Sequence, residues 1–133
     1  YRAALRANAD LVQARTNLGV ALAARGELQA AEQAHREALR REPGFVAARF
    51  NLAMALIDQG RTDEAAAELE RVVARAPELA AARLHLAVLR ANQGRTDEAR
   101  ALAEGVLDRH GADPRAQRIL EFLDRRGEPE TAP

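Results

Sequence analysis

The stretch Asn51-Leu52-Ala53-Met54-Ala55-Leu56 decides the fold, because a closely similar stretch, Asn17-Leu18-Gly19-Val20-Ala21-Leu22, comes before it. A looser third copy, His85-Leu86-Ala87-Val88-Leu89-Arg90, follows it at the same distance. Small residues recur at the same interval along the sequence, namely Gly26, Gly60 and Gly94, and Ala31, Ala65 and Ala99. A period of this length, about 34 residues, indicates structural units that stack and contact only their neighbours. The sequence therefore predicts a solenoid.

Each repeat holds two amphipathic stretches separated by a glycine. Apolar residues recur at helical spacing before and after Gly26 and Gly60, and Pro43 and Pro77 bar extension of the second stretch. Thr62 is expected, like its counterpart Thr96, to act as an N-cap ahead of an Asp-Glu pair. We expect paired helices at 12–25 and 28–41, at 46–59 and 62–75, and at 80–93 and 96–109.

The two ends of the chain depart from this pattern. Residues 1–8 are expected to form the last helix of a preceding unit, and the missing initiator Met suggests a fragment of a longer protein. Asp113-Pro114 is expected to open one more helix, with an N-cap followed by proline. We therefore expect one domain over 1–126, made of 1–11, repeats at 12–45, 46–79 and 80–113, and a capping helix at 114–126. Residues 127–133 are expected to be a disordered tail.

Composition argues against several classes of function. The 20 basic residues, all arginine, balance 20 acidic ones, so no overall field favours nucleic acid or an anionic membrane. The chain has no Cys, no Ser and no apolar run approaching about 20 residues, the length of a membrane span. Its histidines are scattered over different elements, and no phosphate loop is present. We expect no catalysis, no cofactor and no metal site; the histidines are His35, His85 and His110.

Helix–turn–helix units of about 34 residues, with glycine, alanine and proline recurring at these positions, resemble the tetratricopeptide repeat family. Repeat one matches the family pattern at Leu18, Gly19, Leu22, Gly26, Ala31, Ala38 and Pro43. The resemblance implies an all-α, right-handed solenoid of about three such units, with a leading half-repeat and a C-terminal capping helix. It further implies that the first helix of each pair lines a concave face where partners bind.

The resemblance points twelve residues of this chain toward that inner face; two are Thr16 and Ile119, and the other ten are the candidate binding residues. A central column would hold Val20, Met54, Val88 and Phe122, flanked by Phe50, Leu84 and Arg118 and by Asn17, Asn51 and His85. Exposed apolar residues such as Phe50 and Met54 would mark an interaction site. The alternative is that these residues pack between helices.

Two polar patterns on this face lead to different expectations. The Asn17 and Asn51 pair resembles the asparagine ladder of O-linked GlcNAc transferases, although an asparagine can equally bond within its own stack. The charged clamp of co-chaperone repeat domains is disfavoured, since its positions hold Gln13, Thr16, Asn17, Ala47, Phe50 and Asn51. A basic mouth at Arg115, Arg118, Arg125 and Arg126 would suit an acidic segment, or only solubilise the terminal helix.

An arginine also recurs at a repeat position that is usually aromatic in the family, at Arg15, Arg49 and Arg83. We expect its stem to pack while its head reaches water or a nearby Glu, with a repeated ligand contact as the alternative.

Three hypotheses on function follow. The first is a non-catalytic scaffold that binds a peptide or protein partner in the concave groove. The second is a non-catalytic arm of a larger enzyme, such as a glycosyltransferase. The third is self-assembly into a homo-oligomer through the solenoid ends, where Tyr1 and Leu5 would leave a stacking face uncovered.

Overall fold

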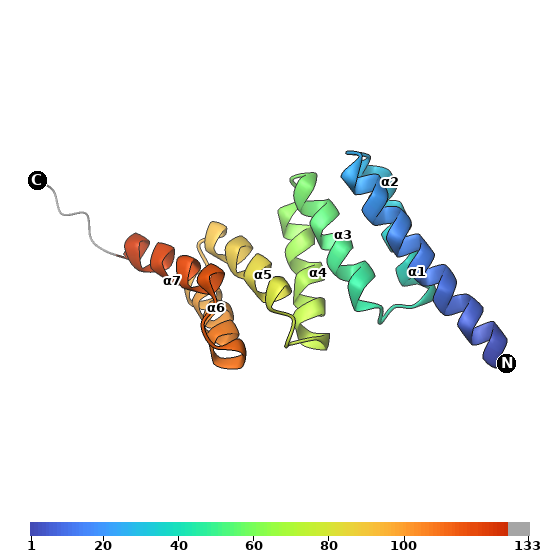
Figure 1. Cartoon of the computed structure of the whole chain (residues 1–133). Helices are drawn as coiled ribbons and strands as arrows, with labels where there is room; N and C mark the ends of the chain where they lie inside the picture. The colour runs from blue at the N-terminus through green and yellow to red at the C-terminus, as the bar shows by residue number, and fades with distance from the viewer. Residues whose placement is uncertain (128–133) are drawn as a thin grey trace, which may run out of the picture. The chain divides into compact units, whose positions relative to one another are not determined.

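The structure is a computed structural model that describes residues 1–127, and within that range it contains seven helices and no strand (Figure 1). The expected all-α class is therefore confirmed. The helices are α1 (Arg2–Ala24), α2 (Leu28–Arg41), α3 (Val46–Asp58), α4 (Thr62–Arg75), α5 (Ala80–Asn92), α6 (Thr96–His110) and α7 (Pro114–Gly127).

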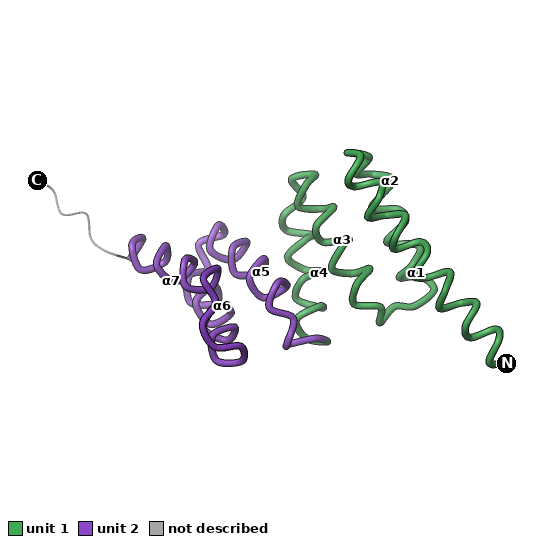
Figure 2. The backbone as a smooth tube through the Cα atoms, viewed as in Figure 1, with its two compact units in different colours: residues 1–75 green, residues 76–133 purple. Residues whose placement is uncertain are grey.

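The chain folds as two compact units, shown in green and purple in Figure 2. Unit 1 is Tyr1–Arg75 and contains α1 to α4, while unit 2 is Ala76–Pro133, described as far as Gly127, and contains α5 to α7. In unit 1, α1 packs on α2, α2 on α3 and α3 on α4, and α1 also contacts α3. In unit 2, α6 packs on both α5 and α7, and α5 contacts α7.

The turns inside the helix pairs explain why a glycine recurs once in every repeat. Gly26, Gly60 and Gly94 have φ angles of 79°, 78° and 78°, a left-handed conformation that residues with a Cβ rarely adopt. After the first of them, the amide of Glu27 donates to the carbonyl oxygen of Leu22 at 2.9 Å. Each glycine thus ends one helix and lets the chain reverse into the next.

The N-terminal helix differs from the expected arrangement. Separate helices at 1–8 and 12–25 were expected, but α1 runs without a break from Arg2 to Ala24. Residues 9–11 contain neither Gly nor Pro, so nothing in the local sequence interrupts the backbone ladder. The expectation of two helices here is wrong, because an apolar pattern that weakens does not by itself end a helix.

The N-cap expectation for the two threonines is also wrong. Thr62 and Thr96 are the first residues inside α4 and α6, and the N-cap of α6 is Arg95, without a side-chain capping bond. The acidic pairs that follow do lie in the first helical turns, where they suit the positive end of the helix dipole.

Small residues let the paired helices approach closely. Ala31, Ala65 and Ala99 are each completely buried at equivalent repeat positions. Around them, unit 1 buries Leu52, Leu56 and Leu69. Unit 2 has a cluster made of Leu84, Ala103, Val106 and Ala116. A second cluster there holds Ala91, Ala99 and Leu123.

The C-terminal helix begins as expected and ends one residue later. Asp113 caps α7, since its Oδ1 accepts from the amide of Arg115 at 2.9 Å and from that of Ala116 at 3.4 Å. Gly127, assigned to the tail from the sequence, is the last residue of α7. The rest of the expected disordered tail, 128–133, lies outside the described residues. The domain and repeat boundaries stay predictions.

Candidate protein-interaction surface

Unit 2 contains a groove between α5 and α7, which we call the α5–α7 groove. It consists of two adjoining pockets of about 290 and 270 Å³ that share Val88, Arg118 and Ile119. The first is also lined by Ala81, Leu84, His85 and Arg115, and the second by Ala91, Asn92 and Phe122. Five of the ten candidate binding residues therefore come together here, namely Leu84, His85, Val88, Arg118 and Phe122.

The walls of the α5–α7 groove are apolar and accessible. Val88 is 43% exposed and Phe122 is 44% exposed, although both are large hydrophobic residues. Arg126 places its guanidinium carbon 5.4 Å from the centroid of the Phe122 ring, so a cation–π contact holds the ring in place. Leu84 is only 5% exposed and belongs to the core cluster with Val106, so it forms the floor of the groove. The expectation of an exposed Leu84 is wrong, because α6 and α7 both pack over it.

Two guanidiniums give the groove a positive rim. Asp113 accepts from Nε of Arg115 at 3.2 Å and from its Nη2 at 2.9 Å. This arginine lowers the pKa of Asp113 to about 2, and the capping amides act in the same direction. Arg118 has no polar partner within residues 1–127, so its charge is available to a ligand.

The other two arginines of the expected basic mouth do not line the groove. Nε of Arg125 donates to the carbonyl oxygen of Glu121 in its own helix at 3.4 Å. Arg126 contacts Phe122 and donates to the carbonyl oxygen of Ala91 at 3.4 Å. Among the residues that the structure describes, the rim therefore consists of Arg115 and Arg118.

His85 projects a titratable ring into the same groove. Partial desolvation lowers its pKa, and the positive charge of Arg115 lowers it further. At neutral pH the ring is therefore uncharged and adds hydrogen-bonding capacity without adding charge.

Unit 1 carries the other five candidate binding residues. Asn17 and Val20 lie on α1, both exposed, and Phe50, Asn51 and Met54 lie on α3, all partly buried. The side-chain oxygen of Asn17 accepts from Nε2 of Gln13 at 2.9 Å, a bond within its own helix. The Asn51 side chain makes no hydrogen bond with any described residue. These five residues lie on two contacting helices, and a groove that runs through both units stays a prediction.

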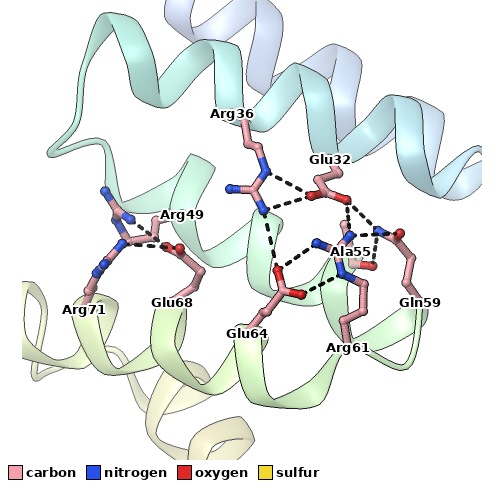
Figure 3. Close-up of polar contacts among 9 residues, drawn as sticks. All are labelled: Glu32, Arg36, Arg49, Ala55, Gln59, Arg61, Glu64, Glu68 and Arg71. Carbon is pink, nitrogen blue, oxygen red and sulfur yellow. Dashed lines mark hydrogen bonds and ion pairs between the residues drawn. The ribbon is translucent and has the colours of Figure 1, made fainter.

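The recurring arginine behaves as the sequence predicts in unit 1. Arg15 pairs with Glu37 across α1 and α2. Arg49 pairs with Glu68 at 2.6 Å (Figure 3). It also donates to the carbonyl oxygen of Pro43 at 2.9 Å. In unit 2, Arg83 instead donates from Nε to the carbonyl oxygen of Pro77 at 2.7 Å. The heads of all three arginines are engaged by the protein itself.

Five lining residues of the groove are not among the ten candidate binding residues, namely Ala81, Ala91, Asn92, Arg115 and Ile119. Two of them were nevertheless singled out from the sequence, Arg115 in the basic mouth and Ile119 at an inward-pointing repeat position. Ile119 lies three residues before Phe122 and Arg115 three residues before Arg118, so each shares a face of α7 with an assigned neighbour. That spacing was the signal that could have found them.

Two other features, a metal cluster and a membrane-spanning helix, are not found in the described part of the chain. Residues 1–127 hold no group of three or more His, Cys, Asp or Glu that could bind a metal ion. Among the same residues, no helix combines the length and the apolar character needed to cross a bilayer.

Several solved structures share this architecture. The chain matches an Arabidopsis OM64 TPR domain with a TM-score of 0.82 at 17% identity, covering 90% of this chain and 98% of that one. The second TPR domain of human RPAP3, in complex with an HSP70 peptide, matches with a TM-score of 0.80 at 16% identity, covering 88% and 98%. The Yersinia enterocolitica type III secretion chaperone SycD, in complex with a peptide of the translocator YopD, matches with a TM-score of 0.81 at 14% identity, covering 90% and 96%.

At these identities the likeness concerns the fold, which is the tetratricopeptide helical solenoid. No curated protein is similar enough to the chain to count as a relative. A model of the tetratricopeptide repeat matches residues 22–79 and again 56–121, which together cover most of the sequence. The chain therefore belongs to the tetratricopeptide repeat family.

Proposed function

We propose that the chain is a non-catalytic protein-interaction module that binds a peptide or partner segment. The α5–α7 groove carries this proposal, because it presents Val88 and Phe122 to solvent beside two guanidiniums. Exposed apolar residues with a polar rim are typical of binding surfaces. The RPAP3 and SycD domains were both solved with bound peptides, which supports a peptide as the ligand.

The chemistry of the groove defines the ligand more closely. Val88, Ile119 and Phe122 would bury an apolar side chain, and the neutral ring of His85 would lie against it. Arg115 and Arg118 would attract a carboxylate nearby. We therefore expect a segment that carries a large apolar residue next to acidic ones. In unit 1, taken by itself, Phe50 and Met54 would offer apolar contacts, and Asn51 would offer a donor and an acceptor to a peptide backbone.

The test begins with peptides selected from a displayed random library against the whole chain. The double variant Val88→Gln with Phe122→Gln should weaken binding of the selected peptides by about tenfold or more, since buried apolar anchors dominate interface energies. Leu5→Gln with Leu18→Gln is the matched control, because it removes two exposed apolar side chains from unit 1. Equal losses in the two double variants, with unchanged circular dichroism, would show that the groove is not the binding surface.

Self-assembly is a second candidate, favoured by the exposed apolar residues of α1. Tyr1 is 96% exposed, Leu5 is 55% exposed and Leu18 is 53% exposed. Tyr1 and Leu5 lie at the N-terminal end of this helix, and a second copy that covered that end would bury both side chains. Sedimentation that shows a monomer at all concentrations would remove this candidate and leave the groove proposal intact.

A further inference from the structure

Unit 1 contains a second concave site, away from the residues expected to bind a partner. A pocket of about 160 Å³ lies at the start of α3 and the end of α4, and its lining includes Arg49, Arg71 and Arg75. The remaining lining residues are Pro43, Gly44, Val46 and Val72. We call this site the arginine pocket. An adjoining pocket of about 240 Å³ shares Arg49 and Arg71 with it.

The arginine pocket lies on the far side of α3 from the expected partner surface. At 3.6 residues per turn, Arg49 is roughly 140° to 160° around the helix from Asn51 and Met54. A molecule bound in the arginine pocket would therefore leave Asn51 and Met54 accessible.

The charges at the pocket do not cancel. Glu68 is the carboxylate beside it, paired with Nη1 of Arg49 at 2.6 Å and with Nη1 of Arg71 at 3.4 Å (Figure 3). Arg75 has no polar partner among residues 1–127. Three guanidiniums and one carboxylate leave a net charge of +2. The positive end of α3 and the negative end of α4 offset each other here, so the side chains set the potential.

Two of the arginines are held in place without a ligand. Arg49 is fixed at both ends of its guanidinium, by Glu68 and by the carbonyl oxygen of Pro43 at 2.9 Å. Its side chain is only 18% exposed. The guanidinium of Arg75 rests against Gly44, where a Cβ atom would lie 2.5 Å from Nη2 and 2.8 Å from Cζ. Gly44 thus provides the space that keeps Arg75 in the pocket.

We propose that the arginine pocket binds a phosphate group. A phosphate monoester carries a charge of about −1.5 to −2 at neutral pH, which matches the net charge of the site, whereas a carboxylate carries half as much. Its three terminal oxygens accept from guanidinium forks on several sides, and bidentate arginine contacts favour that geometry. The volume of the pocket suits such a compact group, whose source is a phosphorylated small molecule or a phosphorylated side chain of a partner.

The experiment titrates three probes into the whole chain and follows the backbone amides by NMR. The probes are inorganic phosphate, acetate, and a capped tripeptide with a central phosphoserine, all at constant ionic strength. We expect saturable shifts at Gly44, Val46 and Val72 with both phosphate probes. Acetate should bind about tenfold more weakly, because it brings one charge and two oxygens. Tighter binding of the tripeptide would identify a phosphorylated side chain, and equal binding a phosphorylated small molecule.

Matched variants assign the effect to these arginines. Arg75→Gln and Arg71→Gln should each weaken phosphate binding by about tenfold or more, and Gly44→Ala should weaken it by displacing Arg75. Arg6→Gln is the control, because it removes an exposed arginine of the same unit. Circular dichroism confirms that each variant is folded. Unsaturable shifts, equal affinity for acetate, or equal losses in Arg75→Gln and Arg6→Gln would overturn the proposal.

Discussion

Two glycines inside helices, Gly19 in unit 1 and Gly105 in unit 2, meet different neighbours. A Cβ atom on Gly19 would lie 2.4 Å from Cε1 of His35, and one on Gly105 would lie 2.7 Å from Nη1 of Arg83. His35 is 1% exposed and packed on all sides, whereas Arg83 is partly exposed and ends in a flexible head. A glycine opposite a buried ring is required by packing, while one opposite a guanidinium leaves room for adjustment.

The same comparison shows how the repeats vary the partner of an arginine. Glu37 and Gly105 are separated by two full repeats and so occupy the same repeat position, as do Arg15 and Arg83. Repeat one pairs Arg15 with Glu37. In repeat three the carboxylate is replaced by Gly105, and Arg83 turns to the carbonyl oxygen of Pro77. The backbone arrangement is kept while the ion pair is exchanged for a bond to the main chain.

The largest effect is expected for Gly19→Ala. The new methyl group would overlap the ring of His35, which has no space to move. The free-energy cost of this overpacking is larger than the free energy gained because alanine favours a helix over glycine. We expect a net loss of about 1–2 kcal/mol in the free energy of unfolding, measured by urea titration with circular dichroism. A stability equal to that of the parent chain would show that the ring of His35 adapts, and the contrast with Gly105 would disappear.

A smaller effect is expected from pH, through the same histidine. Burial lowers the pKa of His35, and its Nδ1 has no hydrogen-bond partner within the described chain. The unfolded state, with a pKa near 6.5, therefore binds more protons than the folded state below that pH. The contribution of the uncharged His35 to the free energy of unfolding should be fully present above about pH 6.5. It should be lost progressively as the pH drops below that value.

The variant His35→Gln separates this contribution from that of His85, whose pKa is lowered as well. We expect unfolding titrations between about pH 5 and 8 to show a shallower pH dependence for His35→Gln than for the parent chain. His85→Gln is the control, since it changes an exposed ring. An unaltered slope in His35→Gln would contradict the assignment.

The smallest effect, of opposite sign, is expected for Gly105→Ala. The Nη1 atom of Arg83 lies at the far end of a flexible side chain and can shift away from a Cβ at 2.7 Å, and alanine favours the helix over glycine by up to about 1 kcal/mol. We expect a small rise in the denaturation midpoint. A loss as large as that of Gly19→Ala would show that Arg83 is as rigidly held as the buried ring.

The sequence alone predicts most helix ends to within a residue, because Gly60 or Pro77 acts locally on the backbone. It fails at α1, where no such residue marks the expected break. It also misjudges Leu84, whose burial depends on two later helices. The meeting of Gly44 with Arg75 could not be found from the sequence, since the two residues are far apart along the chain and the contact depends on a rotamer. Patterns predict the backbone, while the sites depend on side chains that meet across helices.

The turn glycines Gly26, Gly60 and Gly94 have one further consequence. At each of them, nothing lies within 4 Å of where a Cβ atom would be built, so handedness restricts these sites and crowding does not. A D-alanine, unlike an L-alanine, prefers the positive φ angle found there. Chemical synthesis with D-alanine at these three turns should therefore stiffen the unfolded chain and leave the folded one unchanged.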